Sequence, residues 1–279
     1  MLYQEGLKTL KKGMEKGISK KDFLKTGFKK FDKKYGGIYK KGITVIAGSY
    51  QDDLTNLGVS LLKNISIDNE ISSYYISFHD IEIDIIKKVT SAFLQIKMKK
   101  IISGKLKKKD WSKIDKMIKA DTILPTHIIN NNKQDTIELT YMIRNLIFDK
   151  HPNLFIMDGI NDMEGTRNEK LKLIEALRSI SYNTGVPFIL LHELGDSEKL
   201  HKGNGSLLKP GLSSDKYLKT MSDCIIYLAD PVYENIKGKE GKKIKGESAL
   251  IIRKSKYGKV GTINLKYRNN YCLFTDIDQ

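Results

Sequence analysis

Residues 46–62 read IAGSYQDDLTNLGVSLL. A short apolar stretch ends at Gly48, and an amphipathic helix is predicted to begin near Thr55, which is the layout of a phosphate-binding loop. Such a loop needs a glycine, four residues, and then Gly-Lys before Ser or Thr, because backbone N–H groups wrap the phosphates and the lysine neutralises them. Here Asp53 and Leu54 replace that second glycine and the lysine. The sequence therefore predicts the layout of a nucleotide site with altered chemistry.

The acids in this loop oppose a bound phosphate. A carboxylate about 4 Å from a phosphate charge, at an effective dielectric near 20, costs on the order of 4 kcal/mol, and the missing lysine removes a comparable attraction. Asp52 and Asp53 can both contribute to the repulsion. Mg²⁺ could bridge a carboxylate to a phosphate, so the sequence leaves ATP and Mg²⁺ open as cofactors while disfavouring them. The combined change Asp53→Gly and Leu54→Lys is expected to raise nucleotide affinity.

Apolar strands alternate with helical segments along most of the chain. Strands are predicted at 43–47, 73–80, 127–130, 153–159 and 187–193, and helices at 55–65, 83–98, 111–119, 136–149 and 168–184. This alternation is typical of a mostly parallel sheet with helices on both faces. Further strands at 224–230, 247–256 and 262–267, with a charged hairpin tip at 238–246, predict antiparallel strands near the C-terminus. The predicted fold class is α/β, as a single domain over 18–279.

A separate amphipathic helix is predicted over residues 1–17. Its apolar stripe is narrow and consists of Leu2, Leu7, Leu10 and Met14, with lysines on the other faces. Two glycines, Gly6 and Gly13, weaken it as an isolated helix, so it is expected to need a partner surface.

The formal net charge is +16 and the pI is near 9.5. Such an excess favours polyanionic partners, although a compositional bias toward Lys, Ile and Asn would also produce it. The lysine run at 97–109 is more typical of a solvated face than of a DNA track. No apolar run is long enough to cross a bilayer, which predicts a cytoplasmic protein without a membrane partner. Cys224 and Cys272 lie in apolar stretches and are predicted to be free thiols.

Two further segments carry a family resemblance. TGFKKFDKKYGG at 26–37 precedes the loop, and SGKLKKKDW at 103–111 follows the second strand. Together with the strand–loop–helix they resemble the C-terminal RecA-type motor domain of the DnaB-family replicative helicases, over about residues 18–279. The resemblance implies a RecA-like fold. Only about 20 residues precede the TGF opening, so the family's N-terminal helical domain is expected to be missing, and helix 1–17 resembles the linker between subunits.

The resemblance also implies a vestigial nucleotide site with no intact catalytic residue. Its members are Gly48, Asp53, Leu54, Thr55, His79, Asp158 and Glu193. His79 stands in place of the glutamate that activates water, and Glu193 in place of the glutamine that senses the γ-phosphate. Asp158 keeps the Walker B carboxylate, and Thr55 the hydroxyl that meets Mg²⁺. From the residues alone, Thr55 could equally be a helix N-cap and Asp158 could cap a turn. A lone His79 is poor support for a metal site, and none is predicted.

Two basic segments correspond to contact regions of the family. The loop 195–214 corresponds to one that touches single-stranded DNA, and its candidate residues are Lys199, His201, Lys202 and Lys209. The segment RKSKYG at 253–258 corresponds to one that carries an arginine finger between subunits. There Arg253 and Lys254 are candidate contacts, and Lys256 replaces the finger arginine.

Three hypotheses of function follow. The first is a catalytically degenerate DnaB-like domain that acts in DNA replication or mobile-element biology, by binding DNA or by docking on a replicative helicase or on itself. The second is an active ATP-dependent DNA helicase with an unorthodox loop. The third is a structural or regulatory RecA-fold protein that does not bind nucleic acid. An ATPase assay separates the first two, and salt-dependent DNA binding separates the third.

Overall fold

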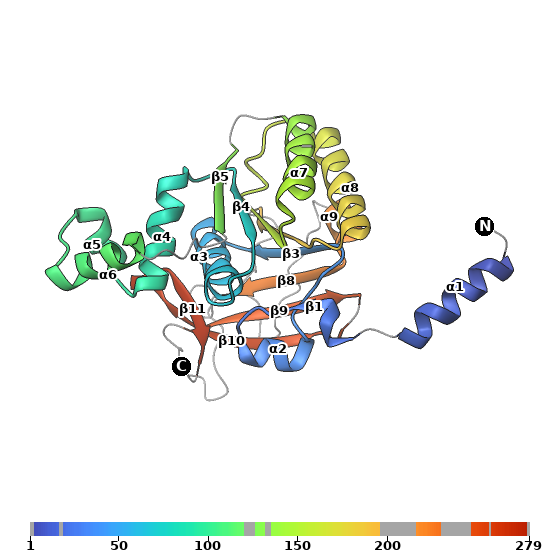
Figure 1. Cartoon of the computed structure of the whole chain (residues 1–279), viewed down its shortest axis with the longest axis horizontal. Coiled ribbons are helices and arrows are strands. Elements are labelled where there is room, and N and C mark those ends of the chain that lie inside the picture. Colours follow the sequence, from blue (N-terminus) through green and yellow to red (C-terminus); the bar gives the residue numbers. More distant parts are fainter. Residues whose placement is uncertain are drawn as a thin grey trace.

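A computed structural model of the chain describes residues 3–16, 19–119, 126–131, 135–195, 216–229, 247–256 and 258–277. Within these residues, nine strands form one central sheet in the order β11-β10-β9-β8-β3-β7-β6-β4-β5 (Figure 1). Their bounds are β3 (Ile43–Gly48), β4 (Ser73–Ser77), β5 (Thr126–Asn130), β6 (Leu154–Asp158), β7 (Phe188–Glu193), β8 (Cys224–Ala229), β9 (Glu247–Ser255), β10 (Gly261–Arg268) and β11 (Leu273–Asp276). A small separate sheet pairs β1 (Phe23–Leu24) with β2 (Ile38–Tyr39).

The sheet is parallel at its centre and antiparallel at one side. β3 pairs in parallel with β7 and β8, β6 with β7 and β4, and β4 with β5. The strands β9, β10 and β11 join β8 as successive antiparallel neighbours. The predicted α/β class, with antiparallel strands near the C-terminus, is confirmed.

Helices cover both faces of this sheet. The helices are α1 (Tyr3–Lys16), α2 (Lys29–Tyr35), α3 (Gln51–Leu62), α4 (Glu82–Leu94), α5 (Met98–Ser103), α6 (Lys108–Lys119), α7 (Thr136–Lys150), α8 (Arg167–Thr184) and α9 (Lys216–Met221). Successive side chains of β3 alternate between two apolar clusters: Ile46 belongs to the cluster that includes Leu57 of α3, and Val45 belongs to the cluster that includes Leu139 of α7 and Leu177 of α8. The alternation arises because neighbouring residues of a strand point to opposite faces.

Several predicted helix boundaries differ from the structure, and two of them differ by four residues. The helix predicted over 83–98 ends at Leu94, because Gln95 adopts a left-handed conformation with φ of 54° and α5 begins afresh at Met98. The helix predicted to begin near Thr55 begins at Gln51, one turn earlier. The loop 195–214 and the hairpin tip 238–246 lie outside the described residues, apart from Gly195.

Helix α1 stands clear of the rest of the fold (Figure 1). It matches the predicted N-terminal helix, and the side chain of Leu7 is exposed. Leu2 and the side chains of Leu10 and Met14 lie outside what the structure describes. Neither α1 nor any other described helix has the length and apolar character needed to cross a bilayer.

Candidate functional site

The predicted nucleotide site forms at the carboxyl edge of the parallel strands. Gly48 ends β3, Asp158 ends β6 and Glu193 ends β7, while His79 follows β4. Ligands of open parallel sheets bind at this edge. The strand order therefore gathers the predicted residues on one side of the sheet.

The carboxylate of Asp158 is fully buried and has three hydrogen-bond donors. Thr55 Oγ1 donates to Asp158 Oδ2 over 2.8 Å, and Tyr75 OH donates to the same oxygen over 2.6 Å. Gln51 Nε2 donates to Oδ1 over 2.8 Å. Burial raises the pKa of Asp158, and the hydrogen bonds from Tyr75 and Thr55 oppose that shift. Burial and the neighbouring Asp158 charge also raise the pKa of Tyr75. Both carboxylate oxygens are thus engaged by the protein itself.

The stretch that would wrap phosphates is helical. Only Ser49 and Tyr50 separate β3 from α3, and the N–H of Leu54 donates to the C=O of Tyr50 over 3.2 Å. The first turn of α3 holds Asp52 and Asp53, and acids at this position stabilise a helix through its dipole. Thr55 is therefore a buried residue within the helix, and the alternative that it caps the helix is wrong. Its neighbouring backbone forms a helical turn in place of an open loop.

Leu54 occupies the lysine position of the loop pattern and lies in the core. Its side chain is fully buried in the apolar cluster that includes Leu57 and Leu228. It packs over Gly48, where an added Cβ would lie 3.2 Å from Leu54 Cδ2. A lysine here would have to bury its ammonium group or unwind the helical turn, and burying an unpaired charge costs several kcal/mol. The nucleotide affinity gain expected for Asp53→Gly with Leu54→Lys therefore requires that unwinding.

A lysine that sequence reasoning missed lies among the acids at this edge. Lys88 Nζ is 2.8 Å from Asp80 Oδ2 and 3.6 Å from Asp52 Oδ1. Burial lowers the pKa of Lys88, but the hydrogen bond and charge of Asp80 and the charge of Asp52 outweigh it, so the pKa is raised. Asp53 lies beside Tyr267, whose pKa is raised by burial and then by the Asp53 charge. Among the described side chains, no group of three or more is placed to hold a metal ion.

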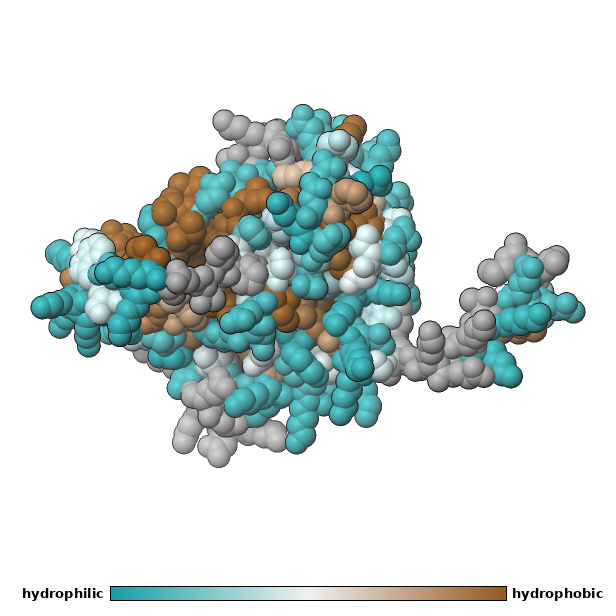
Figure 2. All heavy atoms as spheres, viewed as in Figure 1, coloured by the Kyte–Doolittle hydropathy of each residue, from teal (hydrophilic) through white to brown (hydrophobic). Residues whose placement is uncertain are grey.

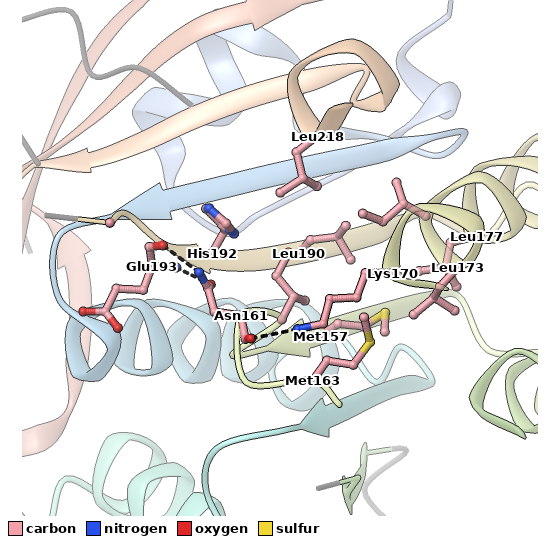
Figure 3. A pocket seen from close by; sticks show the side chains of 13 residues that line it. Met157, Asn161, Met163, Lys170, Leu173, Leu177, Leu190, His192, Glu193 and Leu218 are labelled. Carbon is pink, nitrogen blue, oxygen red and sulfur yellow. Dashed lines mark hydrogen bonds between the residues drawn. The ribbon is translucent and has the colours of Figure 1, made fainter. Parts of the chain in front are cut away.

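His79 and Glu193 lie at the rim of the site. His79 Nδ1 is 3.0 Å from Asp162 Oδ2, and both side chains are about half exposed. The backbone of Glu193 is joined to the side chain of Asn161 by two hydrogen bonds of 2.9 Å. Figure 3 shows the Glu193 carboxylate pointing away from the adjacent cavity. That cavity of about 290 Å³ is mostly apolar and is lined in part by Met157, Leu173, Leu177, Leu190, Lys170 and His192.

The segment predicted to contact another subunit lies at the opposite edge of the sheet. Ser255 of β9 pairs with Cys224, which begins β8. Lys254 Nζ donates to the C=O of Lys219 over 2.8 Å and also to that of Ser222, so it caps the end of α9. Burial lowers the pKa of Lys254.

Lys256 and Arg253, which lie near Lys254 on the same edge of the sheet, have different surroundings. Lys256 Nζ lies 3.5 Å from Asp223 Oδ1 and 4.8 Å from the ring centre of Tyr182. Arg253 is exposed. Within one copy, these three residues and Asp158 lie on opposite edges of the sheet.

The sequence gives only a weak signal, or none, for three residues of the site. Gln51 lies four residues before Thr55, and this spacing places two side chains on one face of a helix. Tyr75 lies on β4, which neighbours β6, but the pairing that brings it to Asp158 is set by the sheet order. Lys88 gives no signal in the sequence that separates it from other lysines. The candidate DNA residues Lys199, His201, Lys202 and Lys209 lie outside the described residues.

Comparison with known proteins defines the class. A solved structure described as an ATPase domain superposes with a TM-score of 0.81 over 99% of both chains, at 20% identity. A DnaB-like replicative helicase, described with its interactions with primase, superposes with a TM-score of 0.81 over 98% of this chain and 66% of that one, at 19% identity. At these identities the likeness shows the fold, which is RecA-like as predicted.

The sequence comparisons name the family. The family described as "DnaB-like helicase C terminal domain" matches residues 24–276, and the chain belongs to it. The probable replicative DNA helicase of Trieres chinensis is 24% identical over 91% of this chain and 57% of its own length. The replicative DNA helicase DnaB of Geobacillus stearothermophilus is 19% identical over 92% of this chain and 57% of its own length. The chain thus spans little more than half the length of these relatives.

The substitution Asp158→Asn tests the buried carboxylate. We expect the free energy of unfolding at pH 7 to rise, because the variant removes a buried carboxylate charge whose folded-state pKa is raised by burial. Gln51 Oε1 is buried without a hydrogen-bond partner among the described residues, so a flipped Gln51 amide can accept from the new Asn amide. The measurement is urea unfolding monitored by circular dichroism.

The sign of the pH dependence follows from the raised pKa. Above the folded-state pKa of Asp158, the buried charge lowers the free energy of unfolding of the wild type, and this loss disappears as the pH falls through that pKa. The difference in unfolding free energy between the wild type and Asp158→Asn should therefore become smaller in acid. Tyr75→Phe is the control, because it removes a donor and keeps the charge, and it should lower stability by about 1 to 3 kcal/mol. A large loss of stability in Asp158→Asn at pH 7 would instead show that the ionised carboxylate stabilises the fold.

Proposed function

We propose that this chain is a non-catalytic DnaB-like domain that acts in DNA replication or mobile-element biology, by binding DNA, by docking on a replicative helicase or on another copy of itself, or by both. The observation that carries the proposal is the closed state of the Asp158 site. The donors Gln51, Thr55 and Tyr75 occupy both of its oxygens, and α3 begins where a phosphate loop would lie.

Nucleotide chemistry would require several changes at this site. A bound phosphate needs free backbone N–H groups, yet the N–H of Leu54 is bonded within α3. A hydrolytic water needs a base in position, and His79 faces Asp162 at the rim. The acids Asp52 and Asp80 already have a cation in Lys88. Magnesium binding at Asp158 and base catalysis by His79 would each require breaking a contact that the fold now makes.

The alternative of a working helicase draws on two observations. Thr55 and Asp158 remain adjacent, as a magnesium site would need, and the relatives are named as replicative helicases. This alternative requires the first turn of α3 to unwind when nucleotide binds, with Gln51 leaving Asp158. A measured turnover would establish it.

ATP turnover is the direct test of the proposal. We expect no phosphate release above background with Mg²⁺ and ATP, in the presence or absence of an oligo-dT strand, and no saturable binding of a fluorescent ATP analogue at micromolar concentrations. The reason is the repulsion from Asp52 and Asp53 together with the missing phosphate loop. Turnover that increases with the DNA strand and is lost in Thr55→Ala would overturn the proposal.

Helix α1 supplies a candidate docking element. Tyr3 is 81% exposed and Leu7 is 44% exposed, and the 14-residue helix stands clear of the sheet and its helices (Figure 1). Isolated helices of this length are marginal in water, so a partner surface would stabilise it. We assign that surface to another copy of the chain or to a replicative helicase.

Deletion of residues 1–17 tests this assignment. The shortened protein should keep its unfolding transition, because none of the described side chains of α1 belongs to the two apolar clusters. It should also shift toward monomer in light-scattering chromatography at matched concentration. The double substitution Tyr3→Ser and Leu7→Ser should produce the same shift in the full chain. An unchanged mass distribution in both variants would exclude α1 as the docking element.

DNA binding is assigned first to the loop 195–214, on the basis of the sequence. The substitutions Lys199→Ala, Lys202→Ala and Lys209→Ala together should reduce the salt dependence of oligo-dT binding, with about 0.7 lost from the log–log slope for each phosphate contact removed. Fluorescence anisotropy of a labelled strand is the measurement. If the wild-type protein binds neither single- nor double-stranded DNA at low salt, the hypothesis of a RecA-fold protein without nucleic acid is favoured.

A further inference from the structure

Half of the net charge of the chain lies in one short region. Residues 97–119 contain ten lysines against two aspartates, which leaves +8 of the formal +16. This region forms α5, α6 and the turns that join them, and it projects from the body of the fold beyond α4 (Figure 1). Figure 2 shows hydrophilic side chains over the end of this projection. A concentrated positive field of this kind favours a polyanionic ligand.

The projection is held in a defined arrangement. Asp110 is buried, and it accepts a hydrogen bond from Lys100 Nζ over 2.7 Å and another from the N–H of Lys107 over 3.1 Å. These bonds lower the pKa of Asp110 and tie α5 to the start of α6. Lys113 Nζ donates to the C=O of Leu94 over 2.7 Å, which ties α6 to the end of α4. The remaining lysines are therefore presented on a supported helix.

Helix α6 separates its side chains into three sectors. Successive residues of a helix are about 100° apart, so the five lysines of α6 fall within about 140° of one another. These lysines are Lys108, Lys109, Lys113, Lys116 and Lys119. Asp110, Ile114 and Met117 form the inward sector, which is buried or half-buried. Trp111 and Ile118 form an exposed apolar sector beside the lysines, with exposed fractions of 50% and 77%.

We infer that α6 binds single-stranded nucleic acid, with phosphates along the lysine sector and a base stacked on Trp111. Strand-binding surfaces combine a basic track with aromatic side chains, because every base has a face that can stack. Lys108, Lys116 and Lys119 are exposed and make no hydrogen bond or ion pair with the described residues, so their charges are available to phosphates. This inference rests on the proposed DNA-binding role and adds a surface separate from the loop 195–214.

An anionic membrane surface fits the sector pattern less well. Helices that lie in a membrane interface bury a broad apolar face together with their basic residues. In α6 the exposed apolar sector consists of Trp111 and Ile118, while the inward sector is already used for packing on the fold. The lysine sector is wider than the apolar one, which favours a soluble polyanion.

The chain provides its own reporter for this surface, because Trp111 is its only tryptophan. Titration of the full chain with an oligo-dT strand at low salt should quench the Trp111 fluorescence in a saturable way. Heparin, which has charge but no bases, should compete for the site while causing little quenching. Vesicles that contain phosphatidylserine are the third probe, and a blue shift with vesicles but no response to oligo-dT would assign the surface to membranes and overturn the inference.

A charge reversal on α6 separates this surface from the rest of the protein. Lys108→Glu with Lys116→Glu should reduce the log–log salt slope of oligo-dT binding by about 1.4, since each phosphate on a single strand contributes about 0.7. Lys150→Glu with Lys172→Glu makes the same charge change on exposed positions of α7 and α8 and is the matched control. Trp111→Ala should weaken binding about tenfold, as expected for loss of one stacked base.

The outcomes distinguish this inference from the proposed function. If a labelled strand shows binding by anisotropy while the Trp111 fluorescence is unchanged, or if both charge reversals lower the slope equally, DNA binding stands and the α6 surface is excluded. If no strand binds by either readout at low salt, the proposed DNA-binding role itself fails. Thermal unfolding of Trp111→Ala should match the wild type, because the side chain is half exposed.

Discussion

The burial of the Asp158 carboxylate constrains the whole carboxyl edge of the sheet. An ionised group in the interior costs several kcal/mol unless hydrogen bonds compensate for the lost water, and each bond to a charged group contributes about 1.5 to 3 kcal/mol. The three donors come from α3 and β4, so the start of the helix and the neighbouring strand must both be in register with β6. With Gln51 and Thr55 bound there, the turn between them is helical. Leu54, which lies on that turn, is then directed into the core.

The same geometry organises the charges around the site. The helical turn places Asp52 and Asp53 at the N-terminus of α3, where the helix dipole favours their negative charge. Lys88 reaches from α4 and lies between Asp52 and Asp80, so this part of the edge carries its own counter-ion. Without such a cation, the carboxylates at this edge would repel one another and attract metal ions. The charge arrangement is thus satisfied within one chain, and it links α4 to α3.

The fold could be predicted from the sequence more completely than the site. The spacing of apolar residues along the sequence predicts the strands and the long helices between them. A buried parallel strand needs a continuous apolar run, and a helix that covers the sheet needs an apolar stripe. The end of α4 could not be predicted, since Gln95 adopts its left-handed conformation without a glycine or proline signal. The predicted start of α3 near Thr55 is wrong for a different reason. The phosphate-loop pattern predicts an open loop before Thr55, but this chain lacks the second glycine of that pattern, and residues 51–54 form the first turn of the helix.

The predicted site residues differ in how far their positions depend on tertiary structure. Asp158 and Glu193 end predicted strands, so their place at the carboxyl edge follows from the strand direction alone. Tyr75 enters the site only through the β4–β6 pairing, and Lys88 only through the packing of α4 beside α3, which no local pattern encodes. Because the polar groups that a motor site would keep open are bonded to each other here, an interaction with a partner must rely on surfaces elsewhere. Among the described surfaces, α6 combines its lysines with exposed Trp111 and Ile118, and α1 exposes Tyr3 and Leu7. Exposed apolar side chains also occur on α4 and α7, including Ile83, Ile137, Tyr141 and Phe148.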